Sequence, residues 1–154
     1  MEDRTTDSAD EAGEQKMLFM QEQMTQFVEG YGMPLIEVSL VVAKSLRHLV
    51  QRLQEIAEES GEELPERLTS PIPIESHSAE STSAASLERL LASVDEDRMD
   101  ILETIIRISI ESKRMTLVDA TLLLREWERT ARQRLARVQR PGEMFSPFEI
   151  EEGF

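Results

Sequence analysis

Apolar residues recur at steps of three and four along most of this chain, the spacing that gathers them on one face of a helix. The first stretch starts at Glu14 and ends at Gly30–Pro34, where two glycines and a proline within five residues stop one helix and start another. The apolar stripe of this first helix is rich in methionine: Met17, Met20, Met24 and Phe27.

The second stretch, up to Glu59, has the clearest helical pattern. Its main seam is Leu35, Val38, Val42, Leu46, Leu49, Leu53 and Ile56. Between Leu35 and Ala43 the apolar residues occupy most of the helix circumference, so several neighbouring elements must cover this part.

A segment rich in Ser, Pro and Glu follows at 60–84 and predicts a linker, extended around Pro71 and Pro73. The linker divides the chain into an N-terminal helical half, 14–59, and a C-terminal helical half, 85–140. The acidic, polar residues 1–13 predict a disordered tail, and 141–154 form an acidic-aromatic C-terminal tail.

The C-terminal half predicts further helices, with Asp95 or Asp97 able to cap one that is rich in isoleucine. Thr116 and Asp119 form a capping box that begins the last helix. Either a tight turn near 112–115 separates these two helices, or one bent helix runs through. The buried seam of the last helix is Leu117, Ala120, Leu124, Trp127, Ala131, Leu135 and Val138.

These patterns predict an all-α protein of two helical halves, each a helix pair or hairpin. A single pair of helices leaves an outer apolar seam uncovered, and self-association is the simplest way to bury it. We therefore expect a homo-oligomer, most simply a dimer, in which the helices form an intertwined bundle. Size-exclusion chromatography with light scattering tests this expectation.

Composition narrows the setting of the protein. The chain of 154 residues lacks cysteine, which agrees with a reducing compartment. Its N-terminus is acidic, unlike a signal peptide, and no run of apolar residues is long enough to span a membrane. A cytoplasmic protein is the expectation.

Motifs that carry chemistry are missing from the pattern. His48 and His77 have no second ligand at helical spacing, and no glycine-rich phosphate-binding motif occurs. Ser and Thr residues have no recognisable base nearby to activate them. The sequence therefore predicts a protein that is not an enzyme and has no cofactor or metal site.

Charge is strongly segregated along the chain, whose formal net charge is −14. The segment 104–140 contains nine basic and four acidic residues, so its local net charge is +5. Four arginines are candidates for binding anions or nucleic acid: Arg125, Arg129, Arg132 and Arg137. Alternatively they pair with Glu126 and Glu128, complement the helix dipole, or pack against a sister subunit.

Two other features suggest binding surfaces. The stripe of Met17, Met20, Met24 and Phe27 is either ordinary core or an adaptable partner face, because methionine repacks readily. The C-terminal tail holds unusual apolar residues for an acidic tail, which either dock onto a protein partner or fold back over the helical core: Phe145, Phe148, Ile150 and Phe154. We assign Trp127 to the core rather than to a base-stacking platform.

The leading hypothesis is a non-catalytic adaptor, assembly or regulatory protein that self-associates and docks a protein partner through its tail. One alternative is a nucleic-acid-associated or transcription-regulating protein that uses the arginine-rich helix. Another is an amphipathic coat on an apolar granule, which the acidic balance does not favour on anionic membranes.

Overall fold

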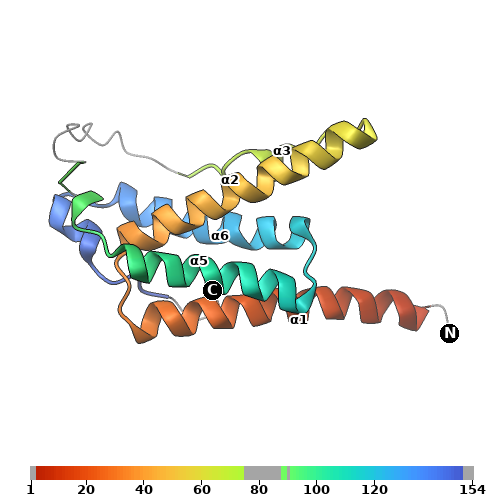
Figure 1. Ribbon diagram of the computed structural model, residues 1–154, viewed down its shortest axis with the longest axis horizontal. Coiled ribbons are helices and arrows are strands. Elements are labelled where there is room, and N and C mark those ends of the chain that lie inside the picture. The colour runs from red at the N-terminus through yellow and green to blue at the C-terminus, as the bar shows by residue number, and fades with distance from the viewer. Residues whose placement is uncertain (1–2, 75–87, 90, 151–154) are drawn as a thin grey trace.

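The computed structural model describes residues 3–74, 88, 89 and 91–150, and over these residues the fold is all-α (Figure 1). The long helices are α1 (Asp3–Gly30), α2 (Leu35–Ser60), α5 (Glu96–Lys113) and α6 (Leu117–Ala136). A short helix α3 (Glu66–Thr69) and a 3-10 turn η1 (Pro141–Phe145) complete the described elements.

The four long helices form a bundle in which the two halves of the chain interleave. α2 packs along α6 and α5, and α1 packs along α5 and α6 (Figure 1). Each helix of the N-terminal half thus finds its main neighbours in the C-terminal half. This arrangement covers the apolar circumference of α2 with helices of the same chain. From the sequence pattern we expected other subunits of an oligomer to provide this cover.

Local signals at the helix ends agree with the sequence. α1 ends at Gly30, Gly32 takes a positive φ of 54°, and Pro34 precedes α2. The backbone N–H of Arg98 donates to Asp95, and that of Asp119 donates to the Thr116 hydroxyl, so both predicted caps are confirmed. Arg114 turns the chain in the left-handed region between α5 and α6, which confirms the tight turn and excludes the single bent helix.

The core lies between the four helices and follows the predicted seams. Leu35, Val38, Val42, Leu46 and Leu53 are buried, and Leu49 is half-buried against them. On α6, Leu124 and Trp127 are fully buried, as predicted. The α2 seam ends earlier than the sequence suggests, because Ile56 lies on the exposed last turns of the helix.

Two predicted segment boundaries differ from the structure. Residues 3–13, expected as a tail, belong to α1, where no proline interrupts the helix and acidic residues suit its N-terminal end. The predicted linker contains α3, whose Leu68 is buried and which packs on α6. The rest of the linker, 75–84, and the predicted helix start near Ala85 lie outside the described residues.

Candidate functional site

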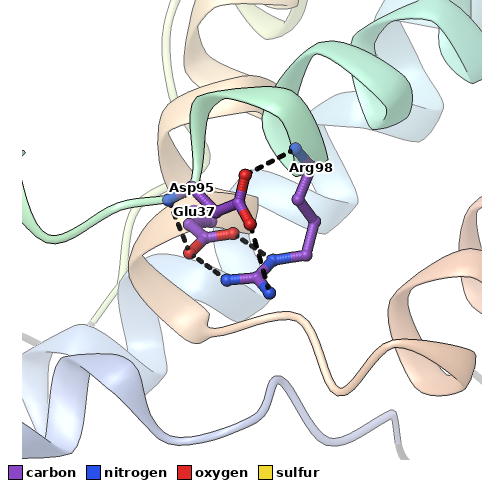
Figure 2. A network of polar contacts seen from close by, with 3 residues as sticks. All are labelled: Glu37, Asp95 and Arg98. Carbon is purple, nitrogen blue, oxygen red and sulfur yellow. Dashed lines mark hydrogen bonds and ion pairs between the residues drawn. The ribbon is translucent and has the colours of Figure 1, made fainter.

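A buried ion pair joins the two halves of the chain at one end of the bundle (Figure 2). Glu37, in the first turn of α2, is fully buried. Its two carboxylate oxygens accept from Nε and Nη2 of Arg98, in the first turn of α5, both at 2.6 Å. The backbone N–H of Asp95 also donates to Glu37, at 3.3 Å. We call this set of three residues the Glu37–Arg98 latch.

The latch is a bidentate, charge-assisted contact, the strongest geometry that an arginine and a carboxylate can adopt. The hydrogen bond with Glu37 raises the pKa of Arg98, and the charges of Glu37 and Asp95 act in the same direction, while desolvation opposes them. The Glu37 carboxylate also lies beside the N-terminus of α5, where the helix dipole favours a negative charge. These contacts compensate the cost of burying Glu37.

Neither Glu37 nor Arg98 stands out as a site residue in the sequence pattern. The available signal was a lone carboxylate within an otherwise apolar stretch, Leu35–Ala43. A charge in such a position must be paired, but the pattern does not say with which residue.

The C-terminal segment folds back over the core. Phe148 is only 3% exposed, and its ring stacks on Trp127 with centroids 5.6 Å apart. The Arg134 guanidinium lies 4.8 Å from the centre of the same ring. Phe145 and Ile150 are half-buried, Ile150 against the core, and Phe154 lies outside the described residues. Within one chain, Phe148 therefore takes the position of the fold-back alternative, against Trp127 and Arg134.

Three of the four candidate anion-binding arginines have partners within the chain. Arg125 is buried, donates to the Leu68 carbonyl at 2.9 Å and pairs with Glu128 at 2.8 Å. Arg132 donates to the Ile72 carbonyl at 2.8 Å. Arg129 pairs with Glu126 at 2.6 Å, as the intrahelical alternative predicted. Arg137, the fourth, is exposed.

The two contacts of Arg125 and Arg132 have a shared consequence. Leu68, in α3, and Ile72, just after α3, lie four residues apart, and Arg125 and Arg132 lie seven residues, or about two turns, apart on α6. The arginines therefore hold the start of the linker along α6 by its main-chain carbonyls. Two of the four arginines that suggested phosphate binding, Arg125 and Arg132, therefore bind main-chain carbonyls of their own chain.

The methionine stripe belongs mainly to the core. Met20 and Met24 are fully buried, and Met17 and Phe27 are half-buried against them. Gln21, on the same helix, accepts a hydrogen bond from the Trp127 indole. The partner-face interpretation is therefore wrong for Met20 and Met24, because α5 and α6 of the same chain already cover them.

One open groove lies between α2 and α5, with a volume of about 710 Å³. Its floor includes Leu49, Ile106 and Ile110, and Lys44 and Glu103 pair across it at 3.1 Å. His48 lines this groove, whereas His77 lies outside the described residues. Charges of both signs line the groove, so it does not favour one class of ligand.

An exposed apolar surface lies on the other flank of α5, beside α1. We name it the α1–α5 face: Tyr31, Ile101 and Ile108 are exposed, and Phe27 and Ile105 are half-buried against the core beside them. The rings of Phe27 and Tyr31 contact each other at a tilt of 39°, with centroids 4.9 Å apart. Tyr31, Ile101 and Ile108 are 69%, 49% and 52% exposed.

Among the described residues, no group of three or more His, Asp or Glu side chains is arranged to hold a metal ion. None of the described helices combines the length and apolar character needed to cross a membrane. No protein-family model, curated protein sequence or solved structure matches this chain.

Proposed function

We propose that this protein is a non-catalytic helical assembly protein that self-associates through the α1–α5 face. The observation that carries the proposal is the exposure of two isoleucines and a tyrosine on a face that has no charged side chain, in a chain where 31% of residues are charged. Exposed apolar surface of this kind marks interaction sites on soluble domains.

The position of the face follows from the register of α1 and α5. Lys113 Nζ lies 4.5 Å from the centre of the Phe19 ring, which brings these two residues of the antiparallel pair together. Eight residues further along α1 is Phe27, and eight residues back along α5 is Ile105. Since both helices rise equally per residue, Phe27 lies near the level of Ile105. Tyr31 follows directly after the end of α1, and Ile101 lies about one turn before Ile105.

Uncharged residues continue each stripe, although the Lys113 ammonium lies over Phe19 at one end and Asp97 precedes Ile101 at the other. At helical spacing the α1 stripe reads Phe19, Gln23, Phe27 and Tyr31, and the α5 stripe reads Ile101, Ile105, Ile108 and Ser112. Neither stripe contains an acidic or basic residue. The α1 and α5 ribbons run side by side (Figure 1), which brings the two stripes onto neighbouring helices.

Charge supports a second copy of the chain as the occupant of this face. Two copies, each with a formal charge of −14, repel each other over most of their surfaces. In a two-fold interface a residue near the axis meets its own copy, so a charge there would face a like charge. A face without charges avoids this repulsion. Full burial of an isoleucine contributes about 1.5–3 kcal/mol, and the half-exposed Ile101 and Ile108 would gain roughly half of that each.

Size-exclusion chromatography with light scattering tests the proposal. The expected mass of the wild-type chain is twice 17.6 kDa. Ile101→Glu and Ile108→Glu should shift the equilibrium to the monomer, and Ile56→Glu is the matched control, because Ile56 is an exposed isoleucine on the far end of α2. A wild-type monomer at high concentration, or a dimer that survives both substitutions, would refute the proposal.

A further inference from the structure

The C-terminal segment occupies a site built entirely by earlier parts of the chain. Residues 146–148 cross the connection between α1 and α2 in an extended conformation, with an isolated antiparallel bridge between Pro34 and Pro147. The N–H of Leu35 donates to the Ser146 carbonyl, and the N–H of Phe148 donates to the Met33 carbonyl, both at 2.9 Å. Main-chain pairing of this kind is how many domains capture extended peptides.

A specific pocket for one aromatic side chain accompanies the main-chain pairing. The Phe148 ring lies against Trp127 at an interplanar angle of 13°, and the Arg134 guanidinium lies over the ring. We call this pocket the Phe148 slot; it is formed by Met33, Leu35, Trp127 and Arg134. None of these four residues belongs to the segment that fills the slot.

Charge around the slot matches the acidic segment that it holds. A hollow of about 400 Å³ next to it is lined by Arg134 and Arg137 of the α6 end and by Glu143 and Glu149 of the segment. The slot thus combines a strand-like main-chain partner, an aromatic pocket and cations. This combination fits an extended, acidic peptide with phenylalanine at its centre.

The connection to the slot is also suited to exchange. Between the end of α6 and the 3-10 turn, Arg137, Gln139 and Arg140 are exposed, and only Val138 is half-buried. The segment is held by main-chain pairing, by the Phe148 ring and by the packing of Ile150, and because its connector is exposed, the same interactions are available on another copy of the chain. Exchange of an identical terminal element between copies is a low-cost route to association.

We propose that the Phe148 slot is a peptide-binding site that accepts the 143–150 segment of a second copy in exchange with its own. The interaction is independent of the α1–α5 face. It joins the tail of one copy to the slot of the next, and therefore links copies head to tail unless two copies exchange reciprocally.

The first experiment empties the slot and refills it. Two hosts are made in the Ile108→Glu background, so that the α1–α5 face cannot contribute: a chain ending at Arg140 and a full chain with Phe148→Ala. Circular dichroism establishes that each host is folded, and the second host serves if the shortened chain does not fold. The single Trp127 reports the slot, because its ring contacts Phe148 and its fluorescence shifts to longer wavelength when water enters.

The probe is a synthetic peptide of residues 141–150. It should restore the original fluorescence in a saturable manner, and added salt should weaken its binding. The same peptide with Phe148→Ala should bind weaker by on the order of 100-fold, whereas Phe145→Ala, at a half-buried position, should bind nearly as well. No recovery, or equal recovery with both altered peptides, would overturn the proposal.

The second experiment tests exchange between whole chains, again with Ile108→Glu. One chain carries Phe148→Ala and so has an intact slot without a competent tail. The other carries Arg134→Glu, which repels the acidic segment and leaves a competent tail without a slot. The mixture should form a complex in light scattering that neither chain forms alone. A mixture that stays monomeric would refute the exchange, while leaving the wild-type dimer of the α1–α5 face to its own test.

Discussion

Glu37 and Arg98 lie 61 positions apart in the sequence and form a bidentate ion pair between the first turns of α2 and α5 (Figure 2). The carboxylate is fully buried, whereas the arginine side chain keeps 27% exposure. The pair therefore sets which level of the N-terminal half meets which level of the C-terminal half, because any shift between α2 and α5 would leave a buried charge unpaired.

Removing Arg98 should destabilise the fold severely. In Arg98→Ala the Glu37 carboxylate stays buried without its counterion, and the free energy of unfolding should fall by about 3–5 kcal/mol in urea denaturation. Arg52→Ala is the control, because its pair with Glu55 is exposed and is worth about 0–1 kcal/mol. The double variant Glu37→Met/Arg98→Met should recover most of the loss. Equal losses at Arg98 and Arg52 would show that the latch has no special role.

At alkaline pH, the wild type and the Arg98→Lys variant should differ in stability. Pairing raises the pKa of Arg98 above its ordinary value, so its contribution to stability is fully present below that ordinary value and is lost only as the pH rises through the higher folded pKa. A lysine has an ordinary pKa of about 10.4 and should lose its charge earlier. Between pH 8 and about pH 11.5, Arg98→Lys should therefore lose more unfolding free energy than the wild type does. Parallel curves for the two proteins would contradict this assignment.

The sequence pattern predicted where most helices begin and end, but it did not predict which helices pack against each other. Glycines and prolines located the break at Gly30–Pro34, and Asp95 and Thr116 marked helix starts, because these effects act within a few residues. The α2 periodicity showed which positions are buried. It could not show that helices of the same chain bury them, since periodicity describes one surface and not its partner.

The functional surfaces were harder to predict for the same reason. Arg125 is buried because a carbonyl of Leu68, 57 positions away, accepts from it, and no helical pattern contains that information. Phe148 was recognised as unusual within an acidic tail, and both docking and capping were compatible with that composition. The choice depended on Trp127, whose fully buried ring offers the stacking surface.

Truncating Phe148 should weaken the whole bundle and not only the tail. The ring packs on Trp127 in the core, and replacing a buried phenylalanine by alanine costs about 3–5 kcal/mol of unfolding free energy. Glu149→Ala, at the exposed neighbouring position, should change it by no more than about 0.5 kcal/mol. Thermal or urea unfolding followed by circular dichroism measures both. A stable Phe148→Ala protein would mean that the slot closes over the missing ring.

Arg125 should control the attachment of the segment that contains α3. Its guanidinium donates through Nε and Nη2 to the Leu68 carbonyl, and hydrogen bonds from a charged group are worth about 1.5–3 kcal/mol. Arg125→Ala leaves that carbonyl without its donor, so the segment should detach locally before the bundle unfolds.

Limited proteolysis with trypsin measures this detachment, because trypsin cleaves after arginine and the exposed Arg67 directly precedes Leu68. Cleavage after Arg67 under native conditions should be faster in Arg125→Ala by the factor that corresponds to the lost hydrogen bonds, about 10- to 150-fold. Arg129→Ala is the matched control, since Arg129 pairs only with Glu126 on its own helix among the hydrogen bonds that the structure describes. If both variants are cleaved at the wild-type rate, the contact between Arg125 and Leu68 does not hold the segment, and the buried position of Arg125 must be stabilised by its pair with Glu128 instead.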